Sequence, residues 1–299
     1  MSLPTYLMSN FPSVRPSLNL QFDSQPTPED MTSHLASVGA TFSRASIGTY
    51  VDANGIIQEA TTGQARPNYS SAGVHEGLLI EESRTNLIKV SEDLTDSDWG
   101  KEADVSVLEN QAIAPDGKAS ADKLVYPSTN QFHRLSYSLS ITNGTSYSFS
   151  AYVKADGYDF VLIRWQDFVR NNQDNVSFDL VDGEVDYTSS FFDSASIEAV
   201  GNDWYKITVV GTAYADSSSV FRIRFQPTAN TDNGISTFTG DDASGGFVWG
   251  AQFEAGSFPT SYIPTIPTFT SRASDGTYFD SNGVLQTAST DEERIDHKY

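Results

Sequence analysis

Apolar and polar residues alternate with a period of two through much of the stretch from about residue 91 to residue 262. This period is typical of β-strands, because successive side chains of a strand point to opposite faces of its sheet. Turn sequences such as TNGT, VDGE and GND separate the runs. The stretch therefore predicts an antiparallel β-sandwich of the jelly-roll type, with strands in DKLVY, QFHRLSYSL, SYSFSAYVKA, FVLIRWQDF, NVSFDLVDG, DWYKITVVGTAY, VFRIRFQP and GFVWGAQFE.

The first 38 residues follow a different pattern. Prolines stand at positions 4, 12, 16, 26 and 28, and neither a period of 3.6 nor a period of two persists. We expect an extended N-terminal arm. Within it, Leu18, Leu20 and Phe22 alternate as an edge strand would, so the arm is expected to dock on another surface.

A short unit occurs twice. Residues 43–60, SRASIGTYVDANGIIQEA, return as residues 271–288, SRASDGTYFDSNGVLQTA, with twelve of eighteen positions identical. Turn residues between two β-prone runs predict a β-hairpin in each copy. Arg66 and Arg294 keep the same spacing from their copies. A unit of this size cannot bury its own apolar face, so each copy needs a partner surface and acts as a connector.

These patterns divide the chain into four parts. We expect a docking arm over residues 1–38, a hairpin connector over 39–90, the jelly-roll sandwich over 91–262, and a Pro-rich linker with the second repeat copy over 263–299. Within the connector, GLLIEESRTNLI at residues 77–88 is predicted to be a buried strand followed by a polar turn.

Charge and cysteine content narrow the function classes. The formal net charge is −21, which argues against nucleic acid as a partner because phosphate binding needs clustered Lys and Arg. The chain has no cysteine, so disulfides and thiolate metal sites are excluded. We also expect no secretion signal and no membrane insertion, because the N-terminus lacks a basic segment and no long apolar run occurs.

Two predicted strands carry a candidate binding face. By alternation, Arg164 and Gln166 share one face of FVLIRWQDF, and a second polar row lies on one face of VFRIRFQP. If the two strands adjoin, their planar donors suit sugar hydroxyls or acidic saccharides. The alternatives are solvated strand faces or intersubunit salt bridges. The candidate carbohydrate-binding residues are Arg164, Trp165, Gln166, Arg222, Arg224 and Gln226.

Tryptophan rings are the other candidate sugar contacts, because exposed aromatic rings can stack on pyranose rings. Trp165 stands beside Arg164 and Gln166, although strict alternation points it inward. Trp204 and Trp249 open core-like strands and are expected in the core.

The sequence predicts no catalytic residues, no metal site and no cofactor. The four histidines lack the spacing of metal ligands, and no Gly-x-Ser-x-Gly motif occurs. Glu81 and Glu82 are adjacent, so on a strand they point to opposite faces and cannot flank one glycosidic bond. DSDW at residues 96–99 is compatible with a calcium site, but an ordinary turn is favoured there. Asp52, Asn54 and Gly55 also resemble the start of a calcium loop, and a hairpin turn is favoured for them.

Several of these strings resemble a known family. They are RPSLNLQF, TFSRASIGTYVDANG, GLLIEESRTNLI, APDGKASADKL and, most specifically, WGAQFEAGSFPTSYIPT at residues 249–265. Together they resemble tailed-bacteriophage virion proteins with a carbohydrate-binding-module-like jelly roll, found in tail fibres, spikes and head fibres. The resemblance spans roughly residues 16–299. It implies a virion location, a homotrimer, other virion proteins as partners, and a role in host attachment or decoration.

The expected function is therefore that of a non-enzymatic structural protein of a phage appendage, one that contributes to host-surface glycan attachment. Two alternatives stay open. One is a capsid decoration protein or head fibre with no glycan role, and the other is a polysaccharide depolymerase, which needs paired carboxylates in a groove.

Overall fold

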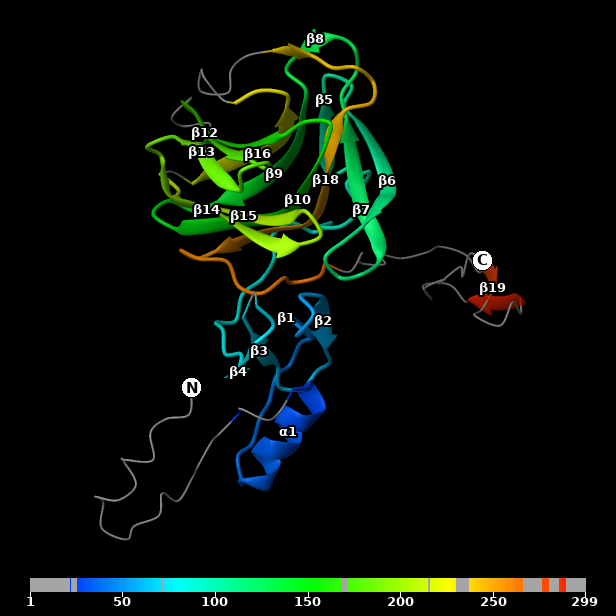
Figure 1. Cartoon of the computed structure of the whole chain (residues 1–299), viewed down its shortest axis with the longest axis vertical. Helices are drawn as coiled ribbons and strands as arrows, with labels where there is room; N and C mark the ends of the chain where they lie inside the picture. Colours follow the sequence, from blue (N-terminus) through cyan, green and yellow to red (C-terminus); the bar gives the residue numbers. More distant parts are fainter. Residues whose placement is uncertain are drawn as a thin grey trace. The chain divides into compact units, whose positions relative to one another are not determined.

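The computed structural model describes residues 22, 26–70, 72–167, 172–214, 216–229, 237–265, 276–279 and 285–288. The chain divides into two compact units, Met1–Thr265 and Ile266–Tyr299. The described residues contain one helix, α1 (Pro28–Ser37), and twenty strands (Figure 1). Helix α1, the one helix among the described residues, is too short and too polar to be a membrane span.

Two six-stranded antiparallel sheets dominate the first unit. The first sheet has the order β14 (Phe192–Gly201), β15 (Trp204–Thr212), β10 (Ser146–Asp156), β18 (Gly245–Ala255), β7 (Ala119–Val125), β6 (Ser106–Ile113). The second has the order β13 (Glu184–Thr188), β12 (Asn172–Asp179), β11 (Phe160–Asp167), β16 (Ser217–Gln226), β9 (Arg134–Ile141), β5 (Trp99–Glu102). Figure 1 draws these sheets in green to orange.

The apolar faces of the two sheets meet in one core. The rings of Phe149 and Phe221, one from each sheet, have centroids 4.3 Å apart, and those of Trp165 and Phe253 lie 5.5 Å apart. Val161, Ile163 and their neighbours on this face are fully buried. The all-β class and the antiparallel jelly-roll sandwich are thus confirmed, and every predicted strand sequence falls on a strand. The four edge strands β5, β6, β13 and β14 were not predicted; β6, β13 and β14 are mainly exposed and have no buried apolar run.

The extended arm predicted for residues 1–38 is wrong over its last part, where α1 forms. Thr27 is the N-cap, with its hydroxyl accepting from the Asp30 amide at 3.1 Å, and Pro28 occupies the first turn. Met31 and Leu35 lie one turn apart and are buried against Ala65. A proline-rich stretch does not exclude a helix here, because proline in the first turn favours helix initiation. Leu18 and Leu20 lie outside the described residues.

Both repeat copies form the predicted hairpin. Strand β1 (Gly48–Val51) pairs with β2 (Ile57–Ala60), and β19 (Gly276–Phe279) pairs with β20 (Leu285–Ala288). All four residue pairs of the first hairpin recur in the second at the same spacing. In the first turn, Asp52 Oδ1 accepts from the amides of Asn54 and Ile56 at 2.8 and 3.0 Å, and Gly55 has a φ of 80°. This confirms the turn interpretation of Asp52.

A third hairpin follows, made of β3 (Pro67–Tyr69) and β4 (His75–Leu78). The buried strand predicted at the start of residues 77–88 is correct only for Gly77 and Leu78, because β4 ends at Leu78 and Ile80 is 80% exposed. After β4 the chain no longer pairs as a strand of this hairpin, and side chains such as Glu81 form hydrogen bonds with residues distant in the sequence. Two short strands, β8 (Asn130–Gln131) and β17 (Phe238–Thr239), pair at one end of the sandwich.

Candidate functional site

The predicted polar row is a real feature of the second sheet. In the register of β11 with β16, Arg164 lies opposite Arg222, Leu162 opposite Arg224, and Phe160 opposite Gln226. Ile163 and Phe221 lie on the other face, in the core. The two strands therefore adjoin, as the candidate site required, and their polar side chains point away from the core.

Two residues from neighbouring strands complete this row. Glu102 of β5 pairs with Arg134 of β9 at 2.9 Å and with Arg222 at 2.8 Å. We call the set Arg134, Arg164, Arg222, Arg224, Gln166, Gln226 and Glu102 the arginine face. Glu102 is the carboxylate that neutralises Arg134 and Arg222 within this set.

The arginine face is largely buried. Arg164 and Arg224 are each only 2% exposed. Burial, together with the charges of Arg134, Arg222 and Arg224, lowers the pKa of the Arg164 guanidinium to about 10, against the opposing effect of Glu102. Arg164 still carries its charge at neutral pH, at a cost in free energy.

Arg164 differs from its neighbours in its contacts. Its Nε is buried without a hydrogen-bond partner, and no hydrogen bond or ion pair of its side chain is present among the described residues. Directly opposite it stands Arg222, a like charge, which is an unfavourable cross-strand pair. Arg164 is thus a buried cation that the described protein groups do not neutralise.

The two glutamines orient the other guanidiniums. Gln166 Oε1 accepts from Arg222 Nη1 at 2.7 Å, and Gln226 Oε1 accepts from Arg224 Nη2 at 2.5 Å. Gln226 Nε2 donates to the Thr228 carbonyl at 2.9 Å. The Arg224 guanidinium also lies 5.6 Å from the centre of the Phe238 ring. These contacts fix donors on the face in defined positions.

Trp165 does not belong to the arginine face. It is 1% exposed, its ring packs against Phe191 and Phe253, and its Nε1 donates to Ser219 Oγ. A ring enclosed in this way cannot stack on a sugar, so Trp165 as a sugar contact is wrong. The inward direction that strict alternation gave is the correct one. Trp204 and Trp249 are 3% and 1% exposed, as expected of core residues.

The other candidate positions have structural contacts. Asp96 forms an ordinary turn, in which its Oδ1 accepts from the Asp98 amide at 2.8 Å. His133 is buried, and its ring nitrogens lie 3.0 and 2.7 Å from the carbonyl oxygens of Ala103 and Thr129. Across the part of the chain that the structure describes, no group of three or more potential metal ligands is present.

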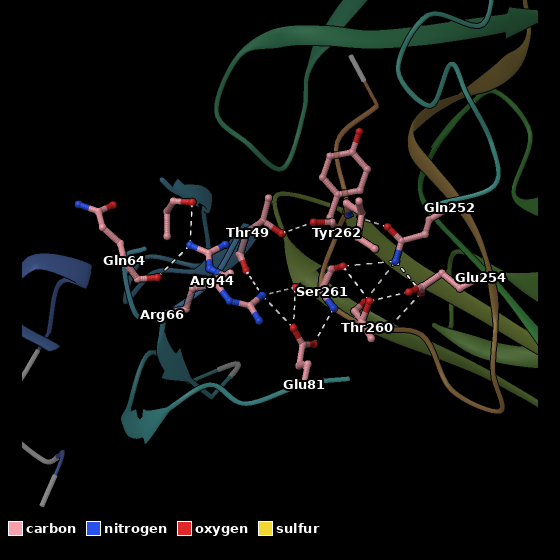
Figure 2. A network of polar contacts seen from close by, with 12 residues as sticks. Arg44, Thr49, Gln64, Arg66, Glu81, Gln252, Glu254, Thr260, Ser261 and Tyr262 are labelled. Carbon is pink, nitrogen blue, oxygen red and sulfur yellow. Dashed lines mark hydrogen bonds and ion pairs between the residues drawn. The ribbon is translucent and has the colours of Figure 1, made fainter. Parts of the chain in front are cut away.

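A second polar network joins the first hairpin to the sandwich (Figure 2). Arg66 Nη1 lies 2.8 Å from Glu81 Oε2, and it also donates to the Thr49 carbonyl and to Ser261 Oγ. Glu81 accepts from the amide and hydroxyl of Ser261 at 2.6 and 2.7 Å. The Thr49 hydroxyl donates to the Tyr262 carbonyl. Repeat residues thus hold the segment that follows β18.

The same segment is fixed from the sandwich side. Glu254 of β18 has no exposed surface and accepts from the amide and hydroxyl of Thr260 at 3.0 and 2.6 Å. Gln252 Nε2 donates to Glu254, and Gln252 Oε1 accepts from the Ile263 amide. The string at residues 249–265 therefore encodes a strand and the surface on which the hairpin docks.

Arg44 stabilises the hairpin itself. Its Nη2 donates to the carbonyls of Ala60, Thr61 and Gln64 at 2.9, 2.8 and 2.9 Å. A Cβ at Gly48 would collide with this guanidinium and would displace it from its carbonyl partners. Arg44 and Gly48 recur in the second copy as Arg272 and Gly276.

A pocket of about 190 Å³ lies beside this network, between β1 and the segment after β18. Tyr50, Tyr69, Lys206 and Glu81 are among the residues that line it. It is smaller than the roughly 300–1,000 Å³ of typical ligand sites. We therefore regard it as part of the hairpin interface.

Sequence reasoning found five residues of the arginine face and missed Arg134 and Glu102. These two lie about 30 and 62 positions before Arg164, on β9 and β5, and only sheet topology brings them to the row. A signal did exist for Arg134, because residues 134–141 alternate polar and apolar and Arg134 falls on the polar face.

No protein-family model matches the sequence, and no curated protein matches it. The solved structures that are similar to part of this chain include the following three, all of low identity. TmCBM61 in complex with β-1,4-galactotriose has 12% identity and a TM-score of 0.37 over 57% of this chain and 99% of that chain. The carbohydrate-binding module CBM6cm-2 of Cellvibrio mixtus lichenase 5A, in complex with cellotriose, has 10% identity and a TM-score of 0.32 over 57% and 99%.

The third is the enzymatically active domain of bacteriophage CBA120 tailspike protein 4. It has 14% identity and a TM-score of 0.31, over 60% of this chain and 21% of that chain. These identities and TM-scores are too low to transfer a function or a site residue.

Proposed function

We propose that this chain is a non-enzymatic structural protein of a tailed-phage virion appendage, a fibre or a spike, and that its sandwich contributes to attachment to a host-surface glycan. Its partners in this proposal are other virion proteins and two further copies of the chain in a homotrimer. The virion location and the trimer rest on the resemblance of the sequence strings to phage proteins.

The arginine face is the observation that carries the glycan part of the proposal. It presents guanidinium and amide donors, held at fixed positions, on one face of a β-sheet. Such planar donors bind sugar hydroxyls and carboxylates well, because their geometry is set before the ligand arrives.

The structural part is supported by the docked hairpin. Arg66, Glu81 and Ser261 join the first repeat copy to the sandwich by an ion pair and several hydrogen bonds. A repeated unit that docks in this way serves to connect folded parts, which is the task of a module in an elongated appendage.

The test is binding to host envelope polysaccharide by the full chain and by Arg222→Ala. Arg222 is partly exposed, and its loss removes a donor that Glu102 and Gln166 hold in place. We expect at least tenfold weaker binding, with Lys118→Ala as a control because Lys118 has a 75% exposed side chain elsewhere on the sandwich. Equal binding by Arg222→Ala would overturn the assignment of the arginine face.

The two alternatives predict different results. A capsid decoration protein or head fibre without a glycan role gives no polysaccharide binding by the wild-type chain, while labelling of intact particles still locates it in the virion. A depolymerase releases reducing sugar from the polysaccharide. Absence of the chain from purified virions contradicts the structural part.

A further inference from the structure

We infer that the arginine face selects an acidic saccharide, whose carboxylate pairs with Arg164 between the guanidiniums of the neighbouring strands. This inference rests on the proposed glycan-binding function and names the chemical class of the ligand.

The arginine face gathers four guanidinium groups on one side of a sheet, in a chain whose formal net charge is −21. Arg164, Arg222, Arg224 and Arg134 come from three adjacent strands. Glu102 forms ion pairs with Arg134 and Arg222. The pairing does not extend to Arg164.

Arg164 is the residue that the folded chain leaves incomplete. It is 2% exposed, its Nε has no partner, and Arg222 stands directly across the ladder. A buried cation without an anion is unfavourable for folding, and such positions persist where function requires them. A ligand carboxylate supplies the missing charge and can bond in the two-pronged geometry that a guanidinium favours.

A saccharide fits better than a small free anion, because an amide donor lies next to Arg164. Gln166 Oε1 is used by Arg222, and Gln166 Nε2 has no hydrogen bond among the described residues. A sugar that places its carboxylate at Arg164 can accept this second donor with a ring hydroxyl. Solvent reaches the cluster where the side chains of Arg222, Arg134 and Glu102 remain 12, 17 and 30% exposed.

The experiment compares two matched probes, trigalacturonic acid and galactotriose, by calorimetry with the full chain. We expect the wild type to bind the acidic trisaccharide at least tenfold more tightly, with an affinity that falls as salt rises. Arg164→Met should lose that preference, and its melting temperature without ligand should be unchanged or higher, because an unpaired buried charge has been removed.

Two further variants complete the design. Arg164→Lys keeps the charge without the planar fork and should retain only part of the preference. Lys118→Met removes one positive charge at an exposed position and should keep all of it.

Each other outcome overturns the inference. Equal binding of both trisaccharides by the wild type leaves the proposed glycan role standing and removes the acidic selectivity. Binding of inorganic phosphate as tight as that of trigalacturonic acid reduces the face to a simple anion site. A lower melting temperature in Arg164→Met gives Arg164 a structural role. If neither trisaccharide binds, the inference fails, and the host polysaccharide assay separately decides the proposed function.

Discussion

Glu254 illustrates how single residues hold this sandwich together. Its carboxylate is fully buried and accepts three hydrogen bonds, from the amide and hydroxyl of Thr260 and from Gln252 Nε2. Hydrogen bonds to a charged group are stronger than neutral ones, and donors left unpaired in the interior are costly. The carboxylate thus links β18 to the segment that carries Ser261 and Tyr262.

We predict that Glu254→Ala lowers the free energy of unfolding by about 3 kcal/mol, because it leaves buried donors without an acceptor. Urea denaturation of the purified chain measures this change. Glu184→Ala, on the exposed edge strand β13, should change the free energy by less than about 0.5 kcal/mol. A similar small effect for both variants would contradict the role given to Glu254.

Glu92 makes the stability of the chain depend on pH. Burial raises the pKa of its carboxyl, and the hydrogen bond from the Tyr262 hydroxyl at 2.6 Å opposes this only in part. The folded state therefore holds the proton more tightly than the unfolded state. The contribution of Glu92 to stability is present below the unfolded pKa of about 4.3 and is lost as the pH rises through the raised folded pKa.

The corresponding variant is Glu92→Gln, which stays neutral at every pH. We predict that the stability of the wild type relative to this variant decreases as the pH rises from about 4 toward neutrality. Denaturation curves at several pH values give the difference. A difference that is constant or that grows with pH would show that the folded pKa is not raised.

At the scale of elements, the first hairpin depends on Arg66 for its attachment. The side chains of Arg66 and Glu81 are 11% and 18% exposed, so their ion pair is shielded from solvent more than a surface pair. Arg66 also bonds Thr49 within the hairpin and Ser261 beyond β18. One guanidinium thus connects three segments distant in sequence.

We predict that Arg66→Ala loosens the hairpin and leaves the sandwich folded. Amides of β1 and β2 should exchange at least tenfold faster, since several bonds of the interface are lost together, while those of β10 and β18 stay protected. Arg294→Ala is the matched control, as the same position of the second repeat copy, and should leave exchange in β1 and β2 unchanged. Equal acceleration in β10 would refute a local role.

The elements that sequence predicted and those that it missed differ in one physical property. Strands such as β10 and β16 bury one apolar face, so their alternation is visible in the sequence. Strands β6 and β14 are mainly exposed and carry no such pattern. Helix α1 is ten residues long and buries few apolar residues, so its apolar pattern is weak. The N-cap at Thr27 is a clearer sequence signal of this helix than its apolar pattern.

For the whole molecule, the absence of cysteine leaves packing and association as the sources of stability. We predict that the chain is a homotrimer, with a mass by light scattering of three times the 32.6 kDa of one chain. The reason is the resemblance to phage appendage proteins. A monomer at micromolar concentration would contradict the trimer and weaken the proposal of a fibre or spike.

The sequence alone determined the strands with a buried apolar face, the two hairpins and the common face of Arg164 with Gln166, because these follow from local periodicity and turn chemistry. It left open whether that face adjoins the face of Arg222. Only the tertiary structure decided that β11 and β16 are neighbours and that Arg134 and Glu102 join them. The physical reason is that burial and charge pairing across strands depend on the order of strands in a sheet, which local pattern does not encode.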